Sequence, residues 1–132
     1  MDFHRPPVQG SLGTCWLISV LHALWVHNRD HLEQMVKDIG SHIEVKLRRH
    51  TVWVQKRFPS WASQPVWASA IEAAAALLMG GPAGIHGGKL SVACELLGIQ
   101  ARELTGPLVA IFPTGGGLHA VCPLGAYELL MT

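Results

Sequence analysis

Cys15 is the residue of this chain that is best placed to act as a nucleophile. It follows the segment Gln9-Gly10-Ser11-Leu12-Gly13-Thr14 and precedes an apolar run that begins at Trp16. The glycines allow a tight loop, and Thr14 has the side chain of a helix N-cap, so Cys15 is expected to open a helix. The positive end of a helix dipole favours a cysteine thiolate, which is the form that attacks a carbonyl carbon. The spacing therefore predicts a nucleophilic thiol.

Gln9 stands six residues before Cys15, and the loop between them can turn its side-chain amide back toward the sulfur. An amide N–H in that position donates a hydrogen bond to the oxyanion that forms when a carbonyl is attacked. The backbone N–H of Cys15 is the expected second donor. The segment thus predicts a nucleophile together with an oxyanion hole for acyl transfer.

A cysteine nucleophile needs a base, and the chain has eight histidines. His119 is favoured, because it follows the Gly115-Gly116-Gly117 loop in a strand-like segment far along the chain, as expected for a partner that folding brings close. His22 lies one or two turns along the helix of Cys15 and does not easily turn back to the sulfur. The remaining histidines lie in polar or loop surroundings and are expected at the surface: His4, His27, His31, His42, His50 and His86.

Three segments resemble, in the same order, the core of the calpain family of papain-like cysteine proteases. The first is Gln9-Gly10-x-Leu12-Gly13-x-Cys15-Trp16, in which Thr14 stands where the family has Asp. The second is 66–80, where a Trp is followed by small residues, an internal Glu and a final Gly. The third is Gly117-Leu118-His119-Ala120-Val121, which is similar to the strand that carries the family's catalytic His. The resemblance covers nearly the whole chain.

The resemblance implies a papain-like α+β fold, in which an N-terminal central helix with Cys15 packs on a C-terminal antiparallel sheet with His119. It implies catalytic roles for Cys15 as nucleophile, His119 as base and Gln9 as oxyanion donor. The substrate-binding residues that it implies are Gly13, Trp16, Trp67, Gly117 and Leu118.

The residue that orients the catalytic His departs from the family pattern. Papain-like enzymes use an Asn that follows the His, whereas the only Asn of this sequence is Asn28. On a continuous helix Asn28 lies about 20 Å from Cys15, too far to orient His119. Glu128, Thr132, a backbone carbonyl and a partner's side chain remain open as replacements, and so does a Cys-His dyad.

Hydrophobic periodicity predicts the elements that must position these residues. Helices are expected over 15–26, 29–40, 66–80 and 89–97, with a glycine-rich connector over 82–88. A hairpin is expected over 43–48 and 52–55, and later strands over 108–112, 118–122 and 127–130, with a loop over 113–117. Because helices come mainly first and antiparallel strands mainly last, the order predicts an α+β fold.

Composition limits the function classes. The 132 residues, with 49% hydrophobic and 14% charged residues, predict a single domain over 1–132, with enough apolar surface for a protein partner to cover one face. A net charge of +1 gives no reason to expect nucleic acid. The basic residues of the hairpin are expected on a solvated face: Lys46, Arg48, Arg49, Lys56 and Arg57.

The three cysteines are widely spaced, which argues against a disulfide framework and against a zinc ribbon. The apolar run 16–26 contains His22 and is too short for a signal peptide or a membrane span, so a cytoplasmic protein without membrane contact is expected. No cofactor or metal is expected, and the nine scattered carboxylates do not favour calcium dependence.

Together these features predict a cysteine peptidase that acts on protein or peptide substrates through a Cys-His thiolate mechanism. The same residues can also catalyse deamidation or acyl transfer, which only product analysis separates from proteolysis. A non-catalytic interaction or assembly protein on a degenerate peptidase scaffold is the alternative from another class.

Overall fold

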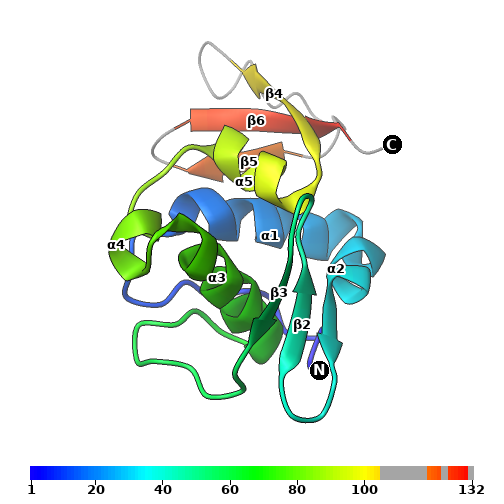
Figure 1. The fold of residues 1–132 in the computed structure, drawn as a ribbon. Coiled ribbons are helices and arrows are strands. Elements are labelled where there is room, and N and C mark those ends of the chain that lie inside the picture. The colour runs from blue at the N-terminus through cyan, green and yellow to red at the C-terminus, as the bar shows by residue number, and fades with distance from the viewer. Residues whose placement is uncertain (105–118, 123–124, 131–132) are drawn as a thin grey trace.

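The structure is a computed structural model, and it describes residues 1–104, 119–122 and 125–130 (Figure 1). For Leu90, Gln100 and all later residues only the backbone is described. The expected strand 108–112, the loop 113–117 with Gly117, and also Leu118 and Thr132, lie outside the described residues.

The described chain is α+β. Its helices are α1 Cys15–His27, α2 Arg29–Met35, α3 Val66–Met79, α4 Pro82–Ile85 and α5 Leu90–Leu97. Its strands are β1 Val36–Asp38, β2 Ile43–Lys46, β3 Thr51–Val54, β4 Gln100–Leu104, β5 His119–Cys122 and β6 Gly125–Leu130. They form an N-terminal sheet in the order β1-β2-β3 and a C-terminal sheet in the order β4-β6-β5, both antiparallel.

Helix α1 is the centre of the fold. It lies between the C-terminal sheet and α3 (Figure 1), and it contacts β5, α5, α2 and α3. Leu17, Leu21 and Leu24 are completely buried, and Ile71 of α3 belongs to the same core. A helix that is covered on most sides needs apolar residues around most of its circumference, which explains the unbroken apolar run of α1.

The N-terminal sheet corrects one prediction. The helix expected over 29–40 ends at Met35, and the chain continues as β1. Val36 pairs with Val45 of β2 and is buried, so the sheet takes the residue that a continued helix would also have buried. The predicted hairpin is confirmed as β2 and β3, with Ile43 opposite Val54.

The remaining helices begin and end close to their predicted positions. Helix α3 is confirmed, and Gly80 follows it in the left-handed conformation with φ of 90°. Helix α5 is confirmed and ends at Leu97, and Gly98 follows it in the left-handed conformation with φ of 73°. The connector expected over 82–88 is corrected, because Pro82 starts the short helix α4, where its fixed φ suits the first helical turn.

The C-terminal sheet contains one strand that periodicity did not predict, β4. It pairs with β6 from Gln100↔Leu130 to Leu104↔Ala126. Strand β5 pairs with the other side of β6, and β5 packs on α1. The expected segregation of helices before strands holds only for this sheet, since the N-terminal sheet is complete before α3 begins.

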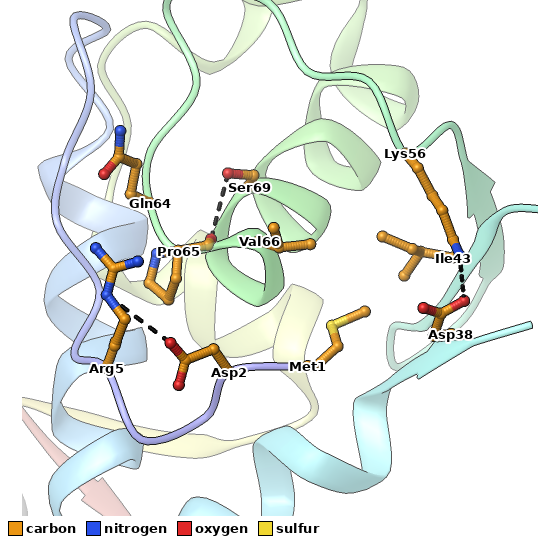
Figure 2. Close-up of a pocket in the computed structure, with 10 residues that line it drawn as sticks. All are labelled: Met1, Asp2, Arg5, Asp38, Ile43, Lys56, Gln64, Pro65, Val66 and Ser69. Carbon is orange, nitrogen blue, oxygen red and sulfur yellow. Dashed lines mark hydrogen bonds and ion pairs between the residues drawn. The ribbon is translucent and has the colours of Figure 1, made fainter. Parts of the chain in front are cut away.

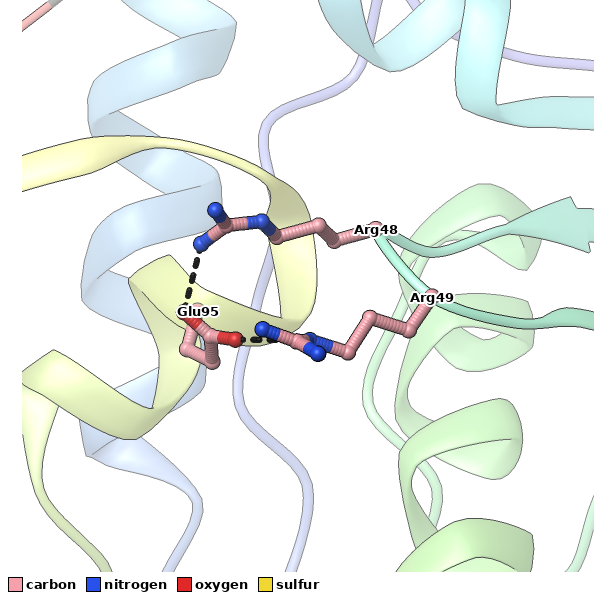
Figure 3. Close-up of polar contacts among 3 residues, drawn as sticks. All are labelled: Arg48, Arg49 and Glu95. Carbon is pink, nitrogen blue, oxygen red and sulfur yellow. Dashed lines mark hydrogen bonds and ion pairs between the residues drawn. The ribbon is translucent and has the colours of Figure 1, made fainter.

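Ion pairs hold the hairpin of the N-terminal sheet to α5 (Figure 3). Arg48 and Arg49 both donate to the carboxylate of Glu95, at 2.6 and 3.1 Å. The backbone N–H of Arg48 also donates to the Leu96 carbonyl at 2.9 Å. Arg48 and Glu95 are about half exposed and Arg49 is 71% exposed, so solvent screens these charges, and the contacts specify geometry more than they add stability.

None of the helices in the described ranges has the length and apolar character needed to cross a membrane.

The core and this ion-pair cluster should differ sharply in their contribution to stability. Leu21→Ala should lower the free energy of unfolding by about 2 to 5 kcal/mol, because Leu21 is completely buried and its loss leaves a cavity in the core. Glu95→Gln should lower it by less than about 1 kcal/mol, because the pairs are exposed. Denaturant unfolding followed by tryptophan fluorescence measures both, and equal losses would contradict this view of the cluster.

Candidate functional site

Cys15 is the first residue of α1, as predicted, and its side chain is half-buried. Thr14 is the N-cap residue, and its carbonyl accepts hydrogen bonds from the backbone N–H groups of Leu17 and Ile18, both at 2.9 Å. The Ser19 hydroxyl donates to the Cys15 carbonyl at 2.6 Å. The first turn of α1, which carries the sulfur, is therefore well ordered by its own hydrogen bonds.

The Thr14 side chain does not cap the helix, which corrects its predicted role. Its hydroxyl donates instead to the carboxylate of Glu72 in α3, at 2.8 Å. Thr14 and Glu72 are both completely buried, so this bond is shielded from water. A buried carboxylate requires hydrogen-bond donors, so the Thr14 hydroxyl donates to Glu72 and does not cap α1.

Glu72 accepts two more hydrogen bonds, both from Ser63. The backbone N–H of Ser63 donates to one carboxylate oxygen and its hydroxyl to the other, each at 2.7 Å. The Ser63 hydroxyl in turn accepts the backbone N–H of Gly10, at 3.1 Å. The network therefore joins α3 to both ends of the segment 10–14 that leads to Cys15.

The segment before Cys15 is also held along its edge by the chain that precedes α3. Val8 and Gln64 exchange backbone hydrogen bonds of 2.7 and 2.9 Å, and Ser11 N–H donates to the Trp61 carbonyl at 3.3 Å. A Cβ on Gly10 would lie only 2.3 Å from that carbonyl oxygen. Only glycine fits there, which gives one of the predicted loop glycines a physical reason.

His86 forms a third contact with this segment, which the sequence reasoning missed. Its Nδ1 accepts the backbone N–H of Gly13 at 3.0 Å, and the Gly87 N–H donates to the Gly13 carbonyl at 2.7 Å. His86 was predicted as a surface histidine, and it is indeed exposed, yet it is also fixed beside the Cys15 segment. Because Nδ1 is an acceptor, the proton of the neutral ring is on Nε2.

Gln9 lies in the loop but one of its amide N–H groups is already used. Its Nε2 donates to the Leu12 carbonyl at 2.7 Å and so closes the loop on itself. A side-chain amide has two N–H groups, so the second can still serve an oxyanion.

Trp16 and Trp67, which were expected to bind substrate, are completely buried and have no surface to offer one. The Trp16 indole N–H donates to the Ile85 carbonyl at 2.9 Å. The Trp67 indole N–H donates to the Arg5 carbonyl at 3.2 Å, and its ring stacks on Phe3 with centroids 5.9 Å apart. Both tryptophans therefore belong to the core of the fold.

His119 is the first residue of β5, the strand that packs on α1. The fold thus brings the strand of the predicted base onto the helix of the predicted nucleophile. Glu128 of β6 is the register partner of His119, and register partners occupy the same face of a sheet. Asn28, in contrast, is the C-cap of α1, at the opposite end from Cys15.

A separate pocket of about 650 Å³ lies beside the N-terminal residues Met1, Asp2 and Arg5 (Figure 2). Its charges are paired internally, with Asp2 3.9 Å from Arg5 and Lys56 2.7 Å from Asp38. The hydrogen bond from Lys56, with a further one from the Gly40 N–H, lowers the pKa of Asp38. No residue of the segment 9–16 lines this pocket, so it is not the site around Cys15.

Within the described residues there is no cluster of three or more His, Cys, Asp or Glu side chains that could hold a metal ion. No model of a known protein family matches the chain, and no curated protein matches it significantly.

Replacing Glu72 should loosen the segment before Cys15. Glu72→Gln keeps the shape of the side chain but replaces one accepting oxygen with an NH₂ group, which faces the donors of Thr14 or Ser63 and cannot accept from them. The lost hydrogen bonds should lower the free energy of unfolding by about 1 to 3 kcal/mol. Hydrogen exchange at Gly10 N–H should accelerate in the same variant. Glu33→Gln, on the exposed face of α2, is the matched control and should change neither quantity; identical behaviour of the two variants would remove Glu72 from this role.

The bond between Gly13 and His86 should protect the Gly13 amide from exchange. His86→Ala removes the acceptor, so hydrogen exchange at the Gly13 N–H should accelerate. His50→Ala, which replaces another exposed histidine, is the control and should leave this exchange unchanged. NMR-detected hydrogen exchange measures both variants, and equal Gly13 exchange rates in the two would refute the contact.

Proposed function

We propose that this chain is a cysteine peptidase of papain-like fold, calpain-like in its motifs, with Cys15 as nucleophile and His119 as base. The observation that carries the proposal is the position of Cys15 at the start of the central helix, behind a segment held by buried Glu72. The packing of β5 on α1 supports the pairing with His119. A thiolate nucleophile suits a reducing compartment, so we place the enzyme in the cytoplasm.

In the proposed acylation step, the Cys15 thiolate attacks the carbonyl carbon of a peptide bond. The S–C bond forms and the carbonyl π pair moves to oxygen, where the second Gln9 amide N–H and the Cys15 backbone N–H stabilise the charge. The oxyanion then collapses, the C–N bond breaks, and the leaving amine takes its proton from the His119 imidazolium. A thioester on Cys15 remains.

In the proposed deacylation step, His119 takes a proton from water and the hydroxide attacks the thioester carbon. The C–S bond breaks, the acid is released, and the thiolate returns. Glu128 is our candidate for the residue that orients His119, because the two are register partners. Loss of an orienting residue lowers turnover without abolishing it, so an enzyme without the family's Asn can still be active.

One observation favours a second function, a non-catalytic binding protein on the same scaffold. One N–H of the Gln9 side-chain amide donates to the Leu12 carbonyl within the same loop, so only the other N–H is left for an oxyanion. In that case the ordered segment before Cys15 is retained for its shape and has no chemical role.

Alkylation of Cys15 as a function of pH distinguishes the two. If Cys15 and His119 form a thiolate-imidazolium pair, iodoacetamide should modify Cys15 rapidly below about pH 7, and His119→Ala should abolish this fast reaction. Cys94 is an internal reference, because burial raises the pKa of its thiol to about 11 and so keeps it unreactive at neutral pH. Peptide mass spectrometry separates the two sites, and an ordinary thiol profile at Cys15 that His119→Ala leaves unchanged favours the binding protein.

Turnover should depend on Cys15 in the same preparation. Cys15→Ala should abolish cleavage of unfolded protein substrates while the unfolding midpoint changes little, because the side chain is only half-buried. Cys94→Ala is the matched control and should keep its activity. Product masses separate hydrolysis from deamidation or acyl transfer, and activity that survives in Cys15→Ala would refute the proposed nucleophile.

A further inference from the structure

A second cavity, of about 530 Å³, opens between the end of β3 and the C-terminal half of α3. Three aromatic side chains line it, those of Trp53, Phe58 and Trp61. Helix α3 contributes Ala73, Ala76 and Leu77, and the residues that follow it, Gly80 to Pro82, also line the cavity. None of its lining residues belongs to the segment 9–16 or to β5, so the cavity is distinct from the candidate catalytic site.

The apolar lining of this cavity is unusually open to solvent. Trp53 and Leu77 are 67% and 65% exposed, although both are large apolar side chains. Phe58 and Trp61 are only half-buried against the core. Pockets of about 300 to 1,000 Å³ that combine an apolar lining with a few polar groups are the usual form of small-molecule sites. The cavity has the size and character of such a site.

Of the described residues that line the cavity, Arg57 alone is ionisable. The other arginines of the hairpin and Lys56 are each bonded to a carboxylate, Glu95 or Asp38. Arg57 has no carboxylate partner among the described residues. A guanidinium beside an apolar cavity without any acid selects a ligand that brings a carboxylate of its own.

The end of α3 favours the same placement of the charge. The C-terminus of a helix carries partial negative charge on its last carbonyl groups, and Gly80 and Gly81, which follow α3, also line the cavity. An anion is therefore disfavoured beside the end of α3 and favoured beside Arg57, on the segment that follows β3.

We propose that this cavity binds a small apolar carboxylate, such as an aryl or branched acyl acid. The carboxylate pairs with the Arg57 guanidinium, and the apolar body lies among Trp53, Phe58 and Trp61. None of the residues proposed for catalysis lines the cavity, so this proposal does not rest on the peptidase chemistry.

Calorimetric titration with 2-naphthoate as the probe tests the proposal. The unsubstituted chain should bind 2-naphthoate at least about tenfold more tightly than the neutral 2-naphthamide, because only the anion makes a charge-assisted pair. Arg57→Gln should remove this preference, and Trp53→Ala should weaken both probes. Lys46→Gln, a cation of the same hairpin outside the cavity, is the matched control and should leave binding unchanged.

Arg57 and Trp53 are both exposed, so their variants should fold, and thermal unfolding of each variant verifies this. Three results would overturn the proposal: absence of 2-naphthoate binding at millimolar concentration, equal affinity for naphthoate and naphthamide, or tighter binding of 2-naphthylmethylammonium. Retention of the anion preference in Arg57→Gln would overturn the assignment of the carboxylate to that residue.

Discussion

Glu72 is completely buried in α3 and forms no ion pair with any cation of the described part of the chain, yet its carboxylate accepts three hydrogen bonds from Thr14 and Ser63. Burying a carboxylate is costly unless its oxygens are satisfied, so the chain must bring those donors to it. As a result, Thr14 before α1 and Ser63 before α3 are both bound to the same carboxylate. The arrangement of the segment before Cys15 thus follows from the need to supply hydrogen-bond donors to the buried Glu72 carboxylate.

The segment before Cys15 is held from three directions, and each contact uses a different part of it. Glu72 holds Thr14, the chain before α3 holds Val8 to Ser11, and His86 with Gly87 holds Gly13. A short loop with so many fixed backbone groups has little conformational entropy left to lose when a ligand binds. That property suits preorganised catalysis, and it suits rigid recognition equally well.

Much of this could be predicted from the sequence, because the signals were local. Continuous apolar character gave α1, alternation gave β2 and β3, and glycines marked the ends of α3 and α5. The single Glu inside an alanine-rich helix was a signal for a buried polar contact, although its partners Thr14 and Ser63 lie 58 and 9 residues away. The register of β1 with β2, the existence of β4 and the approach of His86 to Gly13 depend on tertiary pairing, which periodicity does not encode.

The order of the C-terminal sheet, β4-β6-β5, has a consequence for how the protein is made on the ribosome. The middle strand is the last of the three to be synthesised, so β4 and β5 lack the strand that joins them in this sheet until residues 125–130 have left the exit tunnel. Until then the edges that pair with β6 are open, and β5, which packs on α1, lacks the pairing that holds it in the sheet. The N-terminal sheet and α3 can assemble around α1 well before that moment. The C-terminal sheet that covers one side of α1 is therefore completed late. Nascent chains that stop before β6 are the ones most exposed to aggregation and to quality-control proteases.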